Sequence, residues 1–356
     1  MARNLYASKN WNPIRIFGSV LSLLSSKISL YSLQLDFRVW RNRMTEWKIL
    51  ITDGLNESGQ AILSSAAAVD DRPDISADEL LSVVGEYDAL VVRGRTKVTP
   101  EVFAAAKKLK VVGRAGVGVD NINLEVAKAY GVAVVNAPKS TTLAVAELTL
   151  GLLLAVARSI PRADRTMKQG EWIKKQLEGV ELRGKTLGII GMGNIGSALG
   201  RIATALGMSV LGYDPIVSGD EIEARGARHA SLQELFLKSD FISLHVPLND
   251  STRGMINAQS LSLMKKGVRL VCAARGGVVD EAALLEALNS GQVAAAGLDV
   301  FAKEPPGLTA LVAHPNVVAT PHIGAQTEEA QVRASEDIAT EVLKALRGET
   351  LRWKVV

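Results

Sequence analysis

The segment from residue 186 to 206 constrains the fold of this chain most, because a strand, a glycine-rich turn and a helix follow one another directly. The apolar run TLGII (186–190) leads into GMGNIG (191–196), and an Ala- and Leu-rich helical stretch follows. In a parallel α/β sheet, Gly191 would make the tight turn, Gly193 would admit a pyrophosphate close to the backbone, and Gly196 would let helix and strand pack closely. The segment therefore predicts a dinucleotide-binding loop, which also contains Asn194 and Ile195.

An acidic residue at the end of the next apolar run points to the identity of the dinucleotide. Asp214 lies 18 residues past Gly196, directly after the run at 209–212 and Tyr213. A carboxylate at this place accepts hydrogen bonds from the adenosine ribose hydroxyls and repels a 2′-phosphate, which favours NAD over NADP. The alternative is a plain glycine turn with an incidental aspartate. Flavin enzymes share the fingerprint, so hydride chemistry has to be argued from other residues.

Short apolar runs alternate with helical stretches from residue 49 onward. Several of the runs are continuously apolar, as is typical of parallel strands covered on both faces. Strands are predicted at residues 49–52, 89–92, 111–113, 132–135, 186–190, 209–212, 241–245, 269–272, 295–298 and 317–319. This repeated alternation predicts an α/β protein with two doubly wound parallel sheets.

Two helices mark where the chain is expected to pass between the sheets. The first, at 142–157, is long and apolar, and a turn at 136–138 precedes it. The second, at 328–346, has acids in its first turn, a glycine after its end and apolar residues along one face, which we expect to cover the first sheet. The predicted domains are residues 45–141 together with 326–356, and residues 142–325.

The charge distribution argues against a nucleic-acid partner. The chain has 41 Lys and Arg against 37 Asp and Glu, a net charge of +4. Residues 1–43 hold seven of these basic side chains and one acidic side chain, which leaves 34 and 36 in the rest, a balance of −2. Nucleic-acid binding needs a basic face on the folded body, and this balance does not favour one.

The basic segment 1–43 has two interpretations. It is rich in Ser and Arg and poor in acids, as organellar transit peptides are. Alternatively, Met44 is the true start and the segment is an unstructured or misassigned extension, which is the interpretation we favour. Lys27 and several serines interrupt its apolar residues, so no membrane span is expected.

Cysteine and histidine usage indicates a reducing compartment and no metal. Cys272 is the only cysteine and cannot form an intrachain disulfide, so we expect a cytoplasmic protein. The four histidines show no zinc-site spacing with cysteines or acids.

Three charged residues follow predicted strands of the second sheet, where ligands of such sheets bind: Arg275, Glu304 and His322. A nicotinamide dehydrogenase of 2-hydroxy acids needs a cation for the substrate carboxylate, a base active near neutrality and a group that orients this base. Arginine, histidine and glutamate suit these roles. From spacing alone each residue could equally be structural, and His245 is a rival histidine at a strand end.

Three segments then resemble the signature of a known family. AARGGVVDE (273–281), AGLDVFAKEP (296–305) and TPHIGA (320–325) are similar to segments of the D-isomer-specific 2-hydroxyacid dehydrogenases. GRAGVGVDNI (113–122) points within this family to enzymes that oxidise 3-phospho-D-glycerate. The resemblance implies a Rossmann NAD-binding domain, a flavodoxin-like substrate domain, a cleft between them, and a homodimer or homotetramer built on the nucleotide domain. It also implies the roles given above for Arg275, Glu304 and His322. The further cofactor contacts that it implies are Val246, Ala273, Asp299 near the nicotinamide, and Gly324.

For the substrate, the resemblance places Arg93, Gly94, Gly116, Val117 and Arg275 around a small anionic 2-hydroxy or 2-keto acid. The expected reaction is the NAD-dependent oxidation of 3-phospho-D-glycerate to 3-phosphohydroxypyruvate in serine biosynthesis. Alternatives are a glyoxylate, hydroxypyruvate or other D-2-hydroxyacid reductase and, in another class, an NAD(H)-sensing binding protein.

Some positions depart from the pattern of the phosphoglycerate enzymes. Gly94 and Thr141 stand where these enzymes usually have Ser and Asn, while Arg95 and Lys139 add positive charge nearby. Because the chain ends at Val356, we expect no C-terminal regulatory domain.

Overall fold

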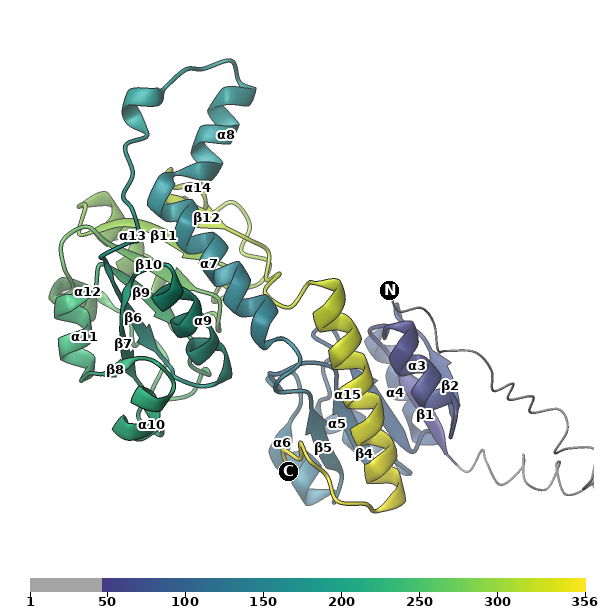
Figure 1. Ribbon diagram of the computed structural model, residues 1–356. Coiled ribbons are helices and arrows are strands. Elements are labelled where there is room, and N and C mark those ends of the chain that lie inside the picture. Colours follow the sequence, from purple (N-terminus) through teal and green to yellow (C-terminus); the bar gives the residue numbers. More distant parts are fainter. Residues whose placement is uncertain (1–46) are drawn as a thin grey trace, which may run out of the picture.

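The computed structural model describes residues 47–356, so the two interpretations of segment 1–43 lie outside the described residues. The described chain forms two lobes, each built on one parallel sheet with helices against it (Figure 1). This arrangement confirms the predicted fold class, an α/β protein with two doubly wound sheets.

The first lobe contains a five-stranded sheet with the order β2-β1-β3-β4-β5. All of its strand pairs are parallel, and the order is that of flavodoxin-like folds. Its strands are β1 (Lys48–Ile51), β2 (Ala68–Asp71), β3 (Ala89–Val92), β4 (Val111–Arg114) and β5 (Ala133–Asn136). The connecting helices are α3 (Glu57–Ser64), α4 (Ala77–Val83), α5 (Pro100–Ala105) and α6 (Leu124–Ala129).

The second lobe contains a seven-stranded parallel sheet with the order β12-β11-β10-β9-β6-β7-β8. Its strands are β6 (Thr186–Ile190), β7 (Ser209–Tyr213), β8 (Arg228–His229), β9 (Phe241–Leu244), β10 (Val268–Cys272), β11 (Val293–Leu298) and β12 (Val317–Ala319). Its helices are α9 (Asn194–Ala205), α10 (Gly219–Ala224), α11 (Leu232–Lys238), α12 (Ala258–Leu263), α13 (Glu281–Asn289) and α14 (Ala310–Ala313). The strand order reverses between β6 and β9, and this switch point is where doubly wound sheets bind ligands.

Two helices carry the chain between the lobes. Helix α7 (Thr142–Arg158) packs against α9, β10 and β11 of the second lobe, and α8 (Ile160–Lys168) continues it outward (Figure 1). Helix α15 (Glu328–Arg347) returns to the first lobe and packs on α3 and β4. We propose that the domain boundaries lie at these two crossings, near residues 142 and 326.

The C-terminal segment completes the first lobe. Ile338, Val342 and Leu343 of α15 belong to the same buried cluster as residues of β1 and β3. Glu341 is 2% exposed, and its carboxylate accepts the backbone N–H groups of Arg352 (2.7 Å) and Trp353 (3.0 Å). The first lobe is therefore made from two separate stretches of chain.

In residues 47–356, no single helix is long and apolar enough to cross a membrane. Helices α7 and α8 reach that length and composition only as a pair, which is bent by 66°. Much of α7 is buried against the second lobe, including Leu152, Leu153 and Val156.

Candidate active site

The loop between β6 and α9 has the geometry that a dinucleotide pyrophosphate requires. Gly191 has φ +99°, and a Cβ there would lie 2.5 Å from the carbonyl oxygen of His245. A Cβ on Gly196 would lie 2.0 Å from the carbonyl oxygen of Gly191, whereas no heavy atom lies within 4 Å of the position of a Cβ on Gly193. No side chain caps the N-terminus of α9. The open backbone at Gly193 and the uncapped N–H groups of Asn194 and Ile195 therefore fit a phosphate group.

Asp214 follows β7 and contacts this loop. One carboxylate oxygen accepts the N–H of Met192 (2.9 Å), and the other accepts those of Ile216 (2.9 Å) and Val217 (3.2 Å). The nearby guanidinium of Arg225 donates to the carbonyl of Met192 and to Glu221. Within residues 47–356 Asp214 has no ion-pair partner, so its negative charge stays available to repel a 2′-phosphate.

The three predicted catalytic residues follow three neighbouring strands. β10, β11 and β12 pair in register, Cys272 with Leu298 and Leu298 with Ala319, so their carboxyl ends share one edge of the sheet. Arg275 follows β10, Glu304 follows β11 and His322 follows β12. The fold brings the segments that carry these residues to one side of the second lobe.

His322 and Glu304 form a hydrogen-bonded pair. The distance from His322 Nδ1 to Glu304 Oε2 is 2.8 Å, and Glu304 Oε1 accepts the N–H of Phe301 at 3.1 Å. When the carboxylate is ionised and the ring neutral, Nδ1 donates this hydrogen bond and Nε2 keeps its lone pair. The His322 side chain is 49% exposed, so a small molecule can reach the ring.

Arg275 lies apart from this pair in its hydrogen bonding. Its Nη1 donates to the carbonyl of Ala274 (2.7 Å), and its Nε pairs with Asp120 of the first lobe (2.8 Å). The sequence therefore predicted the His–Glu contact, whereas the contact of Arg275 with Asp120 was not predicted.

Asp299 holds the segment that carries His322. This carboxylate is 1% exposed and accepts the Thr320 hydroxyl (2.7 Å) and the N–H groups of Ile323 (2.8 Å) and Gly324 (2.9 Å). His322 itself has φ +54°, a left-handed conformation that side chains other than Gly adopt rarely. The three bonds to Asp299 stabilise this conformation, a role that the sequence did not indicate.

The other predicted cofactor residues border the same edge of the sheet. A Cβ on Gly191 would lie 3.1 Å from Val246, which places Val246 beside the glycine loop. Ala273 directly follows β10 and is buried.

His245, the rival histidine, is poorly suited to act as a base near neutrality. Burial lowers the pKa of His245 to about 4, and its Nε2 is hydrogen-bonded to the Ser243 hydroxyl (2.8 Å).

The predicted substrate residues of the first lobe lie at the carboxyl ends of β3 and β4. Arg93 directly follows β3, and burial lowers the pKa of its side chain. No heavy atom lies within 4 Å of a Cβ on Gly94. Gly116 has φ +143°, and the carbonyl of Val117 accepts the side-chain amide of Asn136 (2.7 Å). These residues thus lie on two neighbouring strand ends of the first sheet.

Arg95 and Lys139, whose positive charges were considered for binding a phosphate, both contact other groups of the protein. The Arg95 guanidinium donates to the carbonyls of Thr52, Ile75 and Pro73 and pairs with Asp53 (3.2 Å). Lys139 Nζ lies 5.5 Å from the centre of the Trp353 ring. Arg95 therefore stabilises the loops of the first lobe, and the structure argues against it as a phosphate ligand.

Arg114, a half-buried arginine at the end of β4, was not predicted from the sequence. The Nε of Arg114 is buried without a hydrogen-bond partner, and its Nη1 lies so close to Gly116 that a Cβ there would approach it to 1.5 Å. Burial, and then the positive charges of Arg275 and Arg93, lower the pKa of Arg114 to about 10. Arg114 thus lies within reach of two other positive charges, one from each lobe, as expected around an anion site. Arg114 lies at a strand end, as Arg275 does, so the same criterion could have identified it from the sequence.

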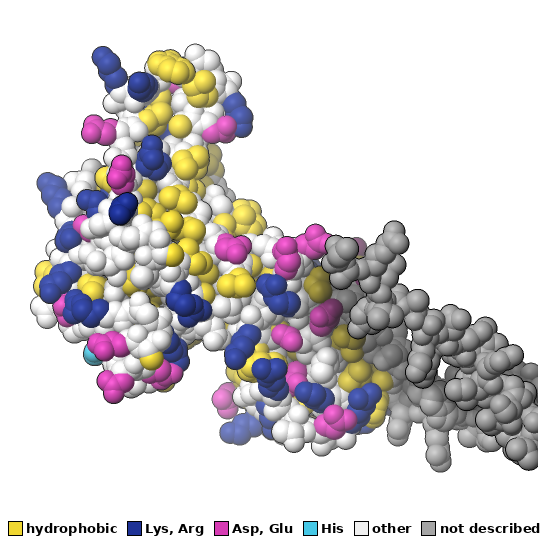
Figure 2. Space-filling model, viewed as in Figure 1, with side chains coloured by type: hydrophobic (Ala, Val, Ile, Leu, Met, Phe, Trp, Pro, Cys, Tyr) yellow, Lys and Arg dark blue, Asp and Glu magenta, His cyan; other side chains and the backbone are white. Residues whose placement is uncertain are grey.

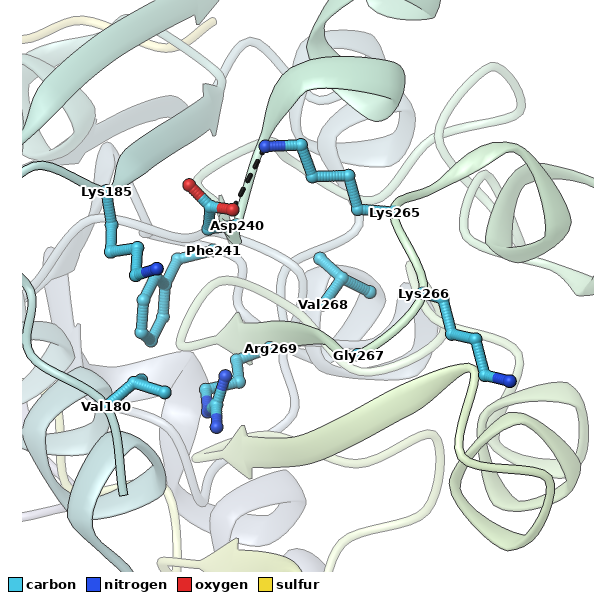
Figure 3. Close-up of a pocket in the computed structure, with 9 residues that line it drawn as sticks. All are labelled: Val180, Lys185, Asp240, Phe241, Lys265, Lys266, Gly267, Val268 and Arg269. Atoms are coloured by element: carbon cyan, nitrogen blue, oxygen red, sulfur yellow. Dashed lines mark hydrogen bonds and ion pairs between the residues drawn. The ribbon is translucent and has the colours of Figure 1, made fainter. Parts of the chain in front are cut away.

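A separate hollow lies at the opposite edge of the second sheet (Figure 3). Its lining includes Lys185 and Asp240, which precede β6 and β9, and Arg269 of β10; Lys265 donates to Asp240 at 3.0 Å. This edge holds the amino ends of the strands, so the hollow is not part of the candidate active site. In residues 47–356 no group of three or more His, Cys, Asp or Glu side chains could hold a metal ion.

The fold, the glycine loop and the His–Glu pair define the class of the protein: a two-domain, dinucleotide-binding protein of the dehydrogenase type. Residues 150–324 match the model of the family described as "D-isomer specific 2-hydroxyacid dehydrogenase, NAD binding domain". A glyoxylate reductase structure from Paecilomyes thermophila is 32% identical, with a TM-score of 0.80, and the match covers 87% of this chain and 98% of that one. A D-lactate dehydrogenase structure from Aquifex aeolicus is 31% identical, with a TM-score of 0.74 and coverage of 85% and 96%. The chain belongs to the D-isomer specific 2-hydroxyacid dehydrogenase family, and its second lobe is the NAD-binding domain.

Curated relatives with higher identity share one name. The D-3-phosphoglycerate dehydrogenase of Methanocaldococcus jannaschii is 48% identical over 303 residues, and that of Homo sapiens is 46% identical over 305 residues. The alignments cover 85% of this chain but only 58% and 57% of those proteins. The chain thus spans a little over half the length of these relatives.

Proposed function

We propose that the protein catalyses the NAD-dependent oxidation of 3-phospho-D-glycerate to 3-phosphohydroxypyruvate. Curated relatives at 43–48% identity are named D-3-phosphoglycerate dehydrogenase. The observation that carries this proposal is the His322–Glu304 pair of 2.8 Å on the same sheet edge as Arg275, which contacts the first lobe through Asp120. Arg93 and Arg114 lie at the strand ends of that lobe. One arginine suffices for the carboxylate that all 2-hydroxy acids share. The two additional cations fit a second, phosphate anion.

The roles of the residues follow from this geometry. The loop 191–196 would hold the pyrophosphate and Asp214 the ribose of NAD, which supplies the hydride acceptor when bound. His322 Nε2 accepts the proton of the 2-hydroxyl group, and Glu304 stabilises the imidazolium that results. Arg275 binds the carboxylate and orients the 2-carbon, while Arg93 and Arg114 bind the phosphate.

A substrate panel tests the proposal. We expect 3-phosphoglycerate to be oxidised with NAD. In the reverse direction, we expect 3-phosphohydroxypyruvate with NADH to give a kcat/KM at least about tenfold above those of glyoxylate and hydroxypyruvate with NADH, as expected for one additional charged contact. A preference for an unphosphorylated acid would overturn the assignment in favour of a reductase. Tight NADH binding without turnover of any 2-keto acid would indicate an NAD(H)-sensing protein instead.

Replacing Asp214 by asparagine should weaken the discrimination against NADP. The amide still accepts a hydrogen bond from the loop but no longer repels a 2′-phosphate, so we expect the NAD-to-NADP ratio of kcat/KM to fall about tenfold or more, which corresponds to about 1.4 kcal/mol. The control is Asp220→Asn, which removes an equal charge from an exposed position in α10. An unchanged ratio in Asp214→Asn would disprove the role of Asp214.

We further propose that two copies of the chain pair through α7, α8 and the segment that follows them. Figure 2 shows hydrophobic side chains gathered along this projecting part of the second lobe. Leu154 is 39% exposed, Ile160 52%, Met167 56% and Trp172 77%. An apolar surface of this kind is typical of a protein–protein interface.

A cytoplasmic location remains a prediction from the sequence.

The double variant Met167→Asp/Trp172→Asp should sediment as a monomer of 37.9 kDa, while the unmodified chain sediments at twice this mass or more. The interface would bury two carboxylates without hydrogen-bond or ion-pair partners, and the cost of removing them from water would prevent association. The control is Leu237→Asp, on the 52% exposed side chain of α11, which should keep the larger mass. A dimer that survives in the double variant would show that another surface makes the contact.

A further inference from the structure

Asp120 and Arg275 form an ion pair that joins the two lobes. Asp120 lies in the loop after β4 of the first lobe, and Arg275 follows β10 of the second, 155 positions further along the chain. The distance from Asp120 Oδ2 to Arg275 Nε is 2.8 Å, and the Arg275 side chain is 28% exposed. This contact has the length of a charge-assisted hydrogen bond.

The loop that carries Asp120 also fits the shape of the Arg275 side chain. A Cβ on Gly118 would lie 1.6 Å from Arg275 Nη2 and 2.7 Å from Asp120 Oδ2. The guanidinium therefore lies directly against the backbone at Gly118, and a larger residue there would displace it. On its other side, Nη1 donates to the carbonyl of Ala274 (2.7 Å).

The hydrogen bonds of Arg275 leave a specific set of donors free. A guanidinium has five N–H donors, of which Asp120 takes the one on Nε and Ala274 takes one on Nη1. The three that remain belong to Nη1 and Nη2, the pair that can bind a carboxylate through two parallel hydrogen bonds. Asp120 thus occupies the side of the fork that a substrate does not need.

The charges around Arg275 make this support necessary. Burial, and then the positive charges of Arg275 and Arg93, lower the pKa of Arg114, and the negative charges of Asp120 and Asp53 raise it. Asp53 is already bonded to the Thr96 hydroxyl (2.5 Å) and paired with Arg95, which leaves Asp120 as the acid in contact with Arg275. Without Asp120, the repulsion from Arg114 and Arg93 would favour other side-chain conformations of Arg275.

We infer that Asp120 is a positioning residue for the reaction: from the opposite lobe it fixes Arg275 so that its Nη groups face the substrate carboxylate. This inference rests on the proposed function of Arg275. The ion pair forms only when the two lobes are close together. The same contact therefore orients Arg275 and joins the lobes.

The test is the variant Asp120→Asn, which keeps the shape of the side chain and removes its charge. We expect kcat/KM for 3-phosphoglycerate to fall about 10- to 100-fold, with a higher KM for this acid, because a displaced catalytic group costs about this factor. KM for NAD should stay within about twofold, since Asp120 does not border the glycine loop. The matched control is Glu125→Gln, which removes an equal charge from an exposed position in the helix after the same loop and should leave the rates unchanged.

A double-mutant cycle then asks whether Asp120 acts through Arg275. Arg275→Lys keeps the positive charge but has no Nε, so in this background Asp120→Asn should lower kcat/KM by less than about threefold. An equal loss in both backgrounds, full activity of Asp120→Asn, or a lower KM for the acid would each overturn the inference. Circular dichroism and the thermal midpoint establish that every variant is folded.

The rate of the unmodified protein on 3-phosphoglycerate tests the proposed function separately. If this protein prefers another 2-hydroxy acid, the same ratios are measured with that acid, because every such substrate has the carboxylate that Arg275 binds. A wrong substrate assignment and a wrong role for Asp120 therefore give different results.

Discussion

Replacement of His322 by asparagine is expected to lower kcat by about 10²–10⁴-fold, the contribution of a positioned general base. The variant loses the ring nitrogen that accepts the hydroxyl proton. Asparagine is the suitable substitute because it tolerates the left-handed backbone better than most residues, and His322 has φ +54°. The loss should therefore reflect the missing base and not a rearranged loop.

Two further measurements define this experiment. The dissociation constant of NADH, followed by fluorescence, should change little, because the glycine loop and Asp214 are untouched. The control His229→Asn removes an exposed histidine at β8, at the opposite edge strand of the same sheet, and should keep the normal rate. Turnover of His322→Asn within a few-fold of normal would eliminate His322 as the base.

Replacement of Asp299 by asparagine is expected to lower both stability and rate. The three donors to Asp299 are the Thr320 hydroxyl and two backbone N–H groups, and an amide NH₂ cannot accept any of them. One buried donor loses its partner, which should cost about 1–3 kcal/mol of unfolding free energy. The segment with His322 is then held less firmly, and a shift of about 1 Å in a catalytic group can lower kcat by about 10²-fold.

Glu341→Gln separates these two effects. Glu341 is also a buried carboxylate that accepts two backbone N–H groups, but it lies in α15 of the first lobe. Both N–H groups bond to one oxygen of Glu341, and the other oxygen accepts Lys344 Nζ (3.0 Å), so the glutamine loses the Lys344 contact. We expect a lower unfolding free energy in urea for this variant and a nearly normal kcat. If both variants lower kcat equally, Asp299 acts through general stability and not through His322.

The sequence predicts most of the architecture because buried parallel strands have a strong apolar signal. The strands β2 and β8, which it did not predict, are edge strands, and edge strands need no such signal. β2 has the sequence AVDD with an exposed and half-exposed pattern, and β8 has only two residues, both exposed. Their pairing depends on the neighbouring strand, which is information that lies elsewhere in the chain.

The sequence predicted site residues whose position depends on where a strand ends. It did not predict which residues a charged side chain contacts. The pairing of Glu304 with His322 required only that neighbouring strands end at one edge. Arg95 donates to a backbone carbonyl, and Asp120 pairs with Arg275. Both contacts depend on side-chain directions and join residues that are far apart in the sequence. No local pattern contains that information.

The two-part construction of the first lobe has a consequence for synthesis. As the chain leaves the ribosome, residues 47–141 emerge long before α15, whose Ile338, Val342 and Leu343 fill the core on one face of the first sheet. The seven-stranded lobe emerges in between as one continuous stretch. Until α15 arrives, Ile49 and Ile51 of β1 lack the part of their cover that α15 supplies, and only the α3 side, with Leu63, packs on that face. The NAD-binding lobe is therefore complete in the emerging chain before the first lobe is, although the first lobe begins earlier in the sequence.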